Sequence, residues 1–122
     1  MKHSVLVVDD HAGFRAEARA MFEGEGFDVV GEAADGAGAI TAAAHLRPSV
    51  VVLDVGLPDV SGLDVVTGIR DGSPGTLVVL VSGRREREFG DRVARSGADA
   101  FLDKARLLPG TLSTLLAGLG PR

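Results

Sequence analysis

The sequence predicts an α/β fold in which helices cover both faces of a parallel sheet. Segments with strand and helix character alternate about five times along the 122 residues, which is the pattern of parallel strands joined by helical crossovers. Apolar runs such as residues 4–8 and 50–53 are continuous rather than alternating. Continuous runs are typical of strands that are buried on both faces.

The chain is expected to begin with a strand at residues 4–8 and a helix at residues 11–24. The helix is amphipathic, because its large apolar residues recur at intervals that place them on one face. These residues are Phe14, Ala18, Met21 and Phe22. Asp10 is the predicted N-cap of this helix, and Gly24 and Gly26 are its predicted stop signals.

The middle of the chain is expected to contain two strands and two helices. The strands are predicted at residues 27–33 and 50–54. The Ala-rich helix between them, at residues 36–47, is closed by Pro48, because proline cannot continue a helix. After the loop that follows the second of these strands, Ser61 caps a short helix that extends to about residue 70.

The last third of the chain repeats the alternation. A turn cluster at residues 71–75 precedes a strand at 76–82. A helix with a mostly solvated pattern is expected at roughly residues 84–96, a strand at 99–103, and a leucine-rich helix at about 107–118.

These elements predict a single (βα)5 domain over residues 1–122, with no output domain in this chain. Crossovers between parallel strands are right-handed, which leaves few topologies for such a unit. The flavodoxin-like strand order 2-1-3-4-5 is favoured.

Composition excludes several classes of function. The chain has no cysteine, so it can form neither a disulfide framework nor a thiolate metal site. Its formal net charge of -4 and its lack of Trp and Tyr argue against direct contact with nucleic acid. The first fifteen residues lack the basic and apolar pattern of a signal peptide, and no apolar run approaches the length needed to span a bilayer. A soluble cytoplasmic domain is therefore expected.

Four of the predicted strands end in polar residues that could serve one phosphate and one metal ion. These residues are Asp9, Asp10, Asp54, Ser82 and Lys104. The carboxyl ends of parallel strands meet at one edge of a sheet, which is where open α/β sheets bind ligands. Crowded carboxylates need a compensating cation, and Mg²⁺ prefers such oxygen ligands. The set therefore predicts a site for phosphoryl transfer to a carboxylate.

Four motifs give the chain a resemblance to a known family. They are Val7-Val8-Asp9-Asp10-His11, Leu53-Asp54-Val55-Gly56-Leu57-Pro58-Asp59-Val60-Ser61-Gly62, Val81-Ser82-Gly83 and Gly97-Ala98-Asp99-Ala100-Phe101-Leu102-Asp103-Lys104. In this order and spacing they resemble the receiver domain of two-component response regulators. The resemblance runs essentially from end to end and is greatest to the NarL/FixJ (LuxR-type) regulators, whose receivers precede a DNA-binding domain.

The resemblance implies a role for each polar residue of the predicted site. Asp54 would be the phosphoacceptor, which takes a phosphoryl group from the phosphohistidine of a sensor histidine kinase. Mg²⁺ or Mn²⁺ would be bound by Asp10, Asp54 and the backbone carbonyl of Gly56, with Asp9 acting largely through water. The metal set is thus Asp9, Asp10, Asp54 and Gly56.

The resemblance also assigns residues that respond to the phosphoryl group. Ser82, Gly83 and Lys104 would bind it, and before it arrives Lys104 would pair with Asp54. Ser82 and Phe101 would form the switch that alters the surface of the fourth helix, fifth strand and fifth helix. That surface would control an output, which is transcription in the longer regulators that the chain resembles, and a homodimer could form on phosphorylation. Slow loss of the phosphoryl group would give the domain catalytic character without making it an ordinary enzyme.

Departures and rival classes are defined by single residues. Ala105 stands where many receivers have proline. The resemblance places Gly56 and Arg84 beside the path of an attacking water, so these two residues would tune the lifetime of the phosphorylated form. An aspartate-nucleophile phosphatase needs a second acid two residues after the nucleophile, where this chain has Gly56. Cobalamin carriers need the pattern Asp-x-His-x-x-Gly, and flavin carriers need aromatic residues on both sides of the flavin and a Ser/Thr-rich phosphate loop. The chain has neither pattern.

A stand-alone receiver or a pseudo-receiver that acts only as an interaction module is the remaining alternative. His3, His11 and His45 lack metal-ligand spacing and are interpreted as structural or surface residues.

Overall fold

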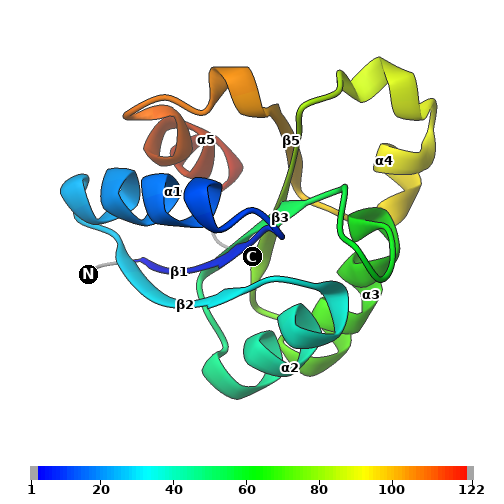
Figure 1. Cartoon of the computed structure of the whole chain (residues 1–122), viewed down its shortest axis with the longest axis horizontal. Coiled ribbons are helices and arrows are strands. Elements are labelled where there is room, and N and C mark those ends of the chain that lie inside the picture. The colour runs from blue at the N-terminus through cyan, green and yellow to red at the C-terminus, as the bar shows by residue number, and fades with distance from the viewer. Residues whose placement is uncertain (1–2, 121–122) are drawn as a thin grey trace.

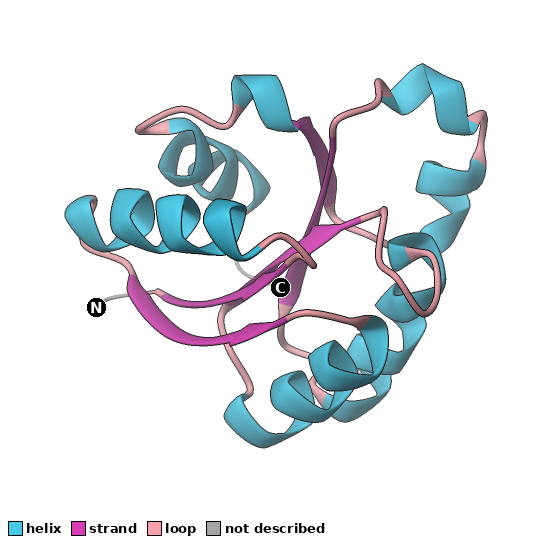
Figure 2. Ribbon diagram, viewed as in Figure 1, coloured by secondary structure: helices cyan, strands magenta, loops and turns pink. Residues whose placement is uncertain are grey.

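A five-stranded parallel sheet forms the centre of the protein, with helices on both of its faces (Figures 1 and 2). The computed structural model describes residues 3–120. The strands are β1 (Ser4–Val8), β2 (Asp28–Ala33), β3 (Val50–Asp54), β4 (Leu77–Ser82) and β5 (Ala100–Asp103). Their order is β2-β1-β3-β4-β5, which confirms the predicted flavodoxin-like topology.

The helices are α1 (Ala12–Gly24), α2 (Gly36–Leu46), α3 (Gly62–Gly72), α4 (Arg92–Ser96) and α5 (Thr111–Leu119). Two short 3-10 turns, η1 (Glu86–Phe89) and η2 (Lys104–Arg106), precede α4 and α5. Helices α1 and α5 lie on one face of the sheet, and α2, α3 and α4 lie on the other (Figure 1).

The core consists of two layers, one on each face of the sheet. Alternate side chains of β1 and β3 point to opposite faces because the side-chain period of a strand is two. The layer under α1 and α5 contains Val5, Val7, Phe22, Val50, Val52, Leu112 and Leu116. The layer under α2, α3 and α4 contains Leu6, Val8, Ala39, Ala43, Val51, Leu53, Val66 and Ile69.

A hydrogen bond between distant parts of the chain ties α1 to α5. The backbone N–H of Gly110, just before α5, donates to the Glu25 carboxylate at 2.6 Å. Glu25 is the residue that follows α1. The start of the last helix is therefore fixed to the end of the first.

Two helix predictions are wrong, and glycine conformation explains both. The predicted helix at 84–96 is divided into η1 and α4, because Gly90 between them has a φ of 60°. The last helix begins at Thr111 rather than 107, because Gly110 has a φ of 89°. Positive φ is incompatible with a right-handed helix and is readily adopted by glycine.

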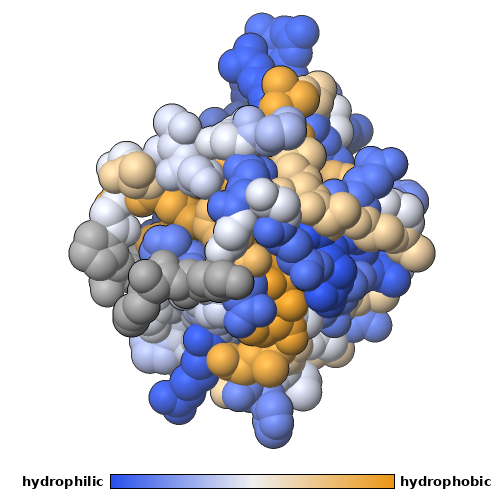
Figure 3. All heavy atoms as spheres, turned by 90° about the vertical axis from the view of Figure 1, so that its left-hand side faces the viewer, coloured by the Kyte–Doolittle hydropathy of each residue, from blue (hydrophilic) through white to orange (hydrophobic). Residues whose placement is uncertain are grey.

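Few large apolar side chains are exposed among residues 3–120. They are Leu46, Val60, Leu108 and Leu119. On the face shown in Figure 3, apolar areas are interrupted by polar side chains. Across the same described range, no helix combines the length and hydrophobicity required to cross a bilayer.

Candidate functional site

The polar residues that follow four of the strands converge at the carboxyl edge of the sheet. Val8 of β1 pairs with Leu53 of β3, so Asp9 and Asp54, the next residue of each, lie side by side. In β4 and β5, Ser82 pairs with Asp103, which places Lys104 just beyond Ser82. The structure thus brings together the residues that the sequence predicted to meet.

Asp9 is the most enclosed residue of the cluster, with a fully buried side chain. One carboxylate oxygen, Oδ1, accepts hydrogen bonds from the backbone N–H of His11 at 2.8 Å and from the His11 ring Nδ1 at 2.9 Å. The other oxygen, Oδ2, accepts from Lys104 Nζ at 2.5 Å. The Asp9 carbonyl oxygen accepts from Arg15 at 2.7 Å. Asp9 is thus fixed by donors on both sides.

The two buried carboxylates differ in how readily they ionise. Burial acts to raise the pKa of Asp9, but the hydrogen bonds from Lys104 and His11 outweigh burial and lower it. Burial raises the pKa of Asp54, and the neighbouring Asp9 charge raises it further. The positive charge of Lys104 and the backbone N–H of Gly56 only partly oppose that rise. Asp9 therefore ionises at a lower pH than Asp54, and Asp54 is the carboxyl group whose ionised form most needs another cation nearby.

Lys104 is shared unequally between the two carboxylates. Its Nζ lies 3.6 Å from Asp54 Oδ1, an ion pair without a hydrogen bond, while its hydrogen bond goes to Asp9. Lys104 thus forms the expected ion pair with Asp54, but its hydrogen bond goes to Asp9, which the sequence did not predict. The Nζ also lies 4.4 Å from the centre of the Phe14 ring, a cation–π contact. Phe14 was expected only as part of an apolar helix face.

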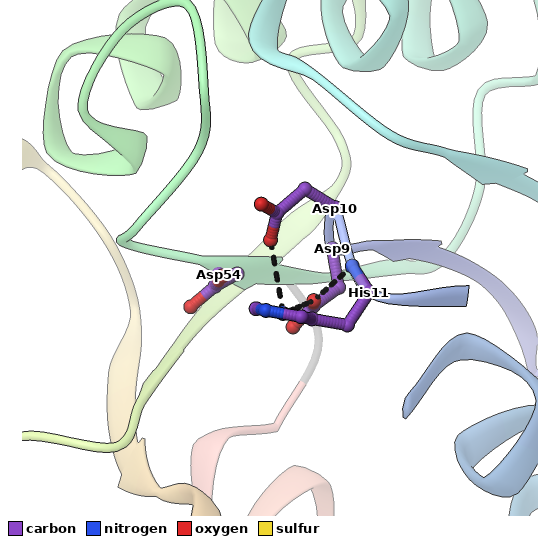
Figure 4. A group of neighbouring side chains, drawn as sticks. All are labelled: Asp9, Asp10, His11 and Asp54. Atoms are coloured by element: carbon purple, nitrogen blue, oxygen red, sulfur yellow. Dashed lines mark hydrogen bonds and ion pairs between the residues drawn. The ribbon is translucent and has the colours of Figure 1, made fainter. Parts of the chain in front are cut away.

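Asp10 and His11 lie at the outer side of the cluster (Figure 4). The His11 Nδ1 is 3.0 Å from Asp10 Oδ1, and the Asp10 side chain is 32% exposed. The prediction that Asp10 caps α1 is wrong, because His11 occupies the N-cap position and no side chain makes the cap hydrogen bond. The Asp10 carboxylate is instead turned toward the imidazole and the other acids.

The cluster offers a set of ligand atoms that fits a divalent cation. Asp9, Asp10, His11 and Asp54 each present one such atom, and these atoms all lie within 4.8 Å of one another. Three of the four are carboxylate oxygens, which suit Mg²⁺ and Mn²⁺. The interpretation of His11 as only a structural or surface residue missed its place here. Its position directly after two acids was the available signal.

Ser82, Gly83 and Phe101 lie on the β4 and β5 side of the cluster. Ser82 is buried, and its hydroxyl accepts a hydrogen bond from the Arg84 backbone N–H at 3.0 Å. Gly83 is exposed. The Phe101 ring is half-buried and lies 5.9 Å from the ring of Phe89, between centroids. Ser82 thus organises the following loop, and Phe101 packs against η1 rather than pointing freely outward.

The loop between β3 and α3 is fixed by Asp59, which sequence reasoning did not single out. The Asp59 carboxylate accepts hydrogen bonds from Gly36 N–H at 2.8 Å and Ala37 N–H at 3.0 Å, both at the start of α2. These hydrogen bonds lower the pKa of Asp59. The loop that contains Gly56 is therefore attached to a neighbouring helix.

Comparisons with known proteins agree with this geometry. Residues 5–113 match the family model described as the response regulator receiver domain. The transcriptional regulatory protein KdpE of Mycobacterium tuberculosis strain H37Rv is 39% identical over 100 residues, which cover 82% of this chain and 43% of KdpE.

Solved structures extend the similarity. A LuxR-family two-component response regulator from Aurantimonas sp. SI85-9A1 has a TM-score of 0.83 at 27% identity, covering 97% of this chain and 87% of that one. The signal receiver domain of the response regulator NarL from Mycobacterium tuberculosis has a TM-score of 0.79 at 32% identity, covering 93% and 96%. These two neighbours bear out the resemblance to NarL and LuxR-type receivers. The chain spans about half the length, or less, of the curated relatives it matches.

Proposed function

The chain belongs to the response regulator receiver domain family, and on that premise we propose that Asp54 is its phosphoacceptor and that phosphorylation controls a transcriptional output. The observation that carries the proposal is the state of Asp54. It is buried at the carboxyl edge of the sheet, its pKa is raised, and Lys104 Nζ lies 3.6 Å away. Burial and the neighbouring Asp9 charge leave the Asp54 carboxylate in need of a cation, and coordination by a metal ion is one of the ways in which a protein activates a nucleophile.

In the proposed reaction, a carboxylate oxygen of Asp54 attacks the phosphorus of a phosphohistidine on a sensor histidine kinase. The new O–P bond forms as the P–N bond breaks, and the kinase imidazole leaves with the bonding electron pair. Mg²⁺, or Mn²⁺ in its place, would neutralise charge on the transferring group. The metal ion would be held by Asp9, Asp10, Asp54 and the backbone carbonyl of Gly56.

Lys104, Ser82 and Gly83 would receive the transferred group. Lys104 already spans Asp9 and Asp54, so a phosphoryl group on Asp54 would give its ammonium a second anionic partner. Ser82 would exchange its hydrogen bond with the Arg84 N–H for one to a phosphoryl oxygen, helped by the N–H of Gly83. Such an exchange would move the loop that leads into η1.

The movement would reach the output surface through Phe101. Its ring packs against Phe89 of η1, so a shift of the loop after Ser82 changes the packing of both rings. We propose that this alters the surface of α4, β5 and α5, and that the longer regulator responds in the cytoplasm by changing transcription, with homodimer formation as one route. Relatives such as KdpE are named as transcriptional regulators, which supports this output. The nucleic acid would be contacted by another domain.

Intact-mass analysis tests the phosphoacceptor directly. With Mg²⁺ and acetyl phosphate, the wild-type protein is expected to gain the mass of one phosphoryl group, and the gain should disappear after mild alkali. Asp54→Asn should show no gain. Asp71→Asn, which changes an exposed aspartate at the end of α3, is the matched control and should be labelled like wild type. Equal labelling of Asp54→Asn and wild type would refute the proposal, and a protein that is not labelled at all would favour the interaction-module alternative.

A further inference from the structure

We propose that Phe14 is a positioning residue for phosphoryl transfer, because its ring holds the Lys104 ammonium beside Asp54, where the transferred group would arrive. The role in transfer rests on the proposed function, whereas the contact between ring and ammonium does not. Lys104 Nζ lies over the Phe14 ring, 4.4 Å from its centre. An aromatic face attracts a cation out to roughly 6 Å from the ring centre.

The Phe14 ring is carried by a well-anchored part of α1. Phe14 lies in the first turn of this helix, and its side chain packs against the core layer under α1 and α5. The next residue, Arg15, donates to the Asp9 carbonyl oxygen at 2.7 Å. Arg15 also donates to the Glu32 carboxylate of β2 at 3.0 Å. The backbone beside Phe14 is thus tied to the end of β1 and to β2, and the ring is a fixed surface.

The Lys104 side chain, in contrast, needs to be positioned. It is a flexible four-carbon chain that extends from the residue directly after β5. The side chain is 22% exposed, so its ammonium has lost part of its water shell. A cation–π contact contributes more to a partly desolvated cation than to an exposed one. The ring therefore stabilises the ammonium in the place where it lies next to the two acids.

The ring restrains the ammonium without occupying its hydrogen-bond donors. A lysine ammonium has three N–H donors, and one of them is hydrogen-bonded to Asp9. Lys104 Nζ is 3.6 Å from Asp54 Oδ1, so no hydrogen bond ties it to the proposed phosphoacceptor. A carboxylate in the place of Phe14 would accept a hydrogen bond and compete with a phosphoryl oxygen, whereas the ring attracts the charge as a whole. Donors thus stay available for the transferred group, in the preorganised manner that favours catalysis.

Loss of the ring should therefore slow phosphoryl transfer. Leucine at position 14 keeps an apolar side chain but lacks the negative face of the ring, so the ammonium could leave Asp54 and pair with Asp9 alone. Phosphorylation of Phe14→Leu by acetyl phosphate should be about threefold to tenfold slower than that of wild type, as expected from the loss of one cation–π contact. Phe14→Tyr keeps the ring face and should stay within about twofold of the wild-type rate.

Intact-mass analysis at a series of times after addition of Mg²⁺ and acetyl phosphate measures these rates. Phe22→Leu is the matched control, since Phe22 lies on the same helix, is fully buried, and packs edge-on against Phe27. It should be less stable than wild type but phosphorylated at the wild-type rate. Circular dichroism verifies that each variant is folded. A double-mutant cycle shows whether Phe14 acts through the lysine, because Phe14→Leu should have no further effect on the rate in a Lys104→Met background.

Proton NMR provides a signature that loss of packing alone would not produce. Protons over the face of an aromatic ring resonate upfield because of the ring current. Lysine occurs only at positions 2 and 104, so a Lys2→Arg background leaves a single set of lysine signals. The ε-CH2 protons of Lys104 should resonate upfield of free lysine in wild type and in Phe14→Tyr, and should return toward the free value in Phe14→Leu.

Three results would overturn the inference. They are an unchanged Lys104 signal in Phe14→Leu, a wild-type rate of phosphorylation in that variant, and equal slowing by Phe14→Leu with and without Lys104. Failure of the proposed function appears separately, as absent phosphorylation of Asp54 in the wild type. Loss of the upfield shift in Phe14→Leu would still show in that case that the ring positions Lys104.

Discussion

Replacing Gly62 with alanine is expected to destabilise the protein more than any ordinary surface substitution. A Cβ at Gly62 would lie 2.2 Å from the carbonyl oxygen of Asp54 and 2.8 Å from the Cα of Val55. Both contacts are with backbone, so no side chain can rotate to relieve them. Relief requires either that the start of α3 move away from the end of β3, or that β3 itself shift.

The expected cost follows from this geometry. Overpacking of a well-packed core costs roughly 1–3 kcal/mol and occasionally more, and a clash with rigid backbone belongs at the upper end. The intrinsic gain of alanine over glycine within a helix, roughly 0.5–1 kcal/mol, offsets part of it. We therefore expect Gly62→Ala to lose about 2–3 kcal/mol of unfolding free energy. A domain of this length has roughly 6–18 kcal/mol, so the variant should fold.

Thermal melts followed by circular dichroism measure the effect. At about 4 °C per kcal/mol for a domain of this size, Gly62→Ala should melt about 8–12 °C below wild type. Gly118→Ala is the matched control, since this glycine is also helical, lies in α5, and has nothing within 4 Å of its added Cβ. Gly118→Ala should melt at or slightly above the wild-type temperature. A Gly62→Ala melt within about 2 °C of wild type would refute the backbone-clash reasoning.

Two further predictions concern charged groups outside the carboxylate cluster. The pKa of Asp59 is lowered by N–H groups at the start of α2, so the Asp59 carboxylate stabilises the fold above its unfolded pKa, and this stabilisation is lost as the pH falls through its folded pKa. Urea unfolding should thus show that Asp59→Asn has a lower free energy of unfolding than wild type at pH 7, and that the difference becomes smaller below about pH 4. A difference that stays constant with pH would contradict this. Arg70 donates to the Asp99 carboxylate at 2.7 Å and to the carbonyl oxygens of Gly97 and Thr76, and its side chain is mostly buried. Arg70→Ala should therefore lose about 1–3 kcal/mol, because hydrogen bonds that involve a charged group contribute more than neutral ones. Arg95→Ala breaks an exposed ion pair with Asp91 and should lose less than about 0.5 kcal/mol; equal losses for the two arginine variants would show that burial does not decide the effect.

Much of the fold was predictable because the strongest sequence signals belong to its centre. The apolar runs of β1 and β3 are buried along their whole length, and burial on both faces is what a continuous apolar run encodes. The boundaries of α4 and α5 were not predictable to the same degree. Gly90 and Gly110 end or delay those helices through positive φ. The φ angle of Gly90, which lies in a charged segment, is not visible in the sequence, whereas the pair Pro109-Gly110 was an available turn signal.

The candidate site was predictable in its members and less so in their pairing. The topology alone brings Asp9, Asp54 and Lys104 to one edge of the sheet. Which carboxylate takes the Lys104 hydrogen bond depends on side-chain geometry beyond the strand ends, and it is Asp9. His11 escaped the prediction for a related reason. Its ring orientation is set by local contacts with two acids, which residue spacing does not specify.

The bond between Glu25 and Gly110 has a consequence for the order in which the chain can fold as it is synthesised. The layer under α2, α3 and α4 is covered by contiguous residues 36–96, so its helices emerge soon after the strands they cover. The other layer needs α5, which emerges after all the other elements of this domain, beside α1, the first helix. Contacts between distant residues form slowly because a long loop must close first. One face of β1 and β3 therefore stays incompletely covered until α5 has been synthesised, and the Glu25–Gly110 hydrogen bond forms only when that face is covered.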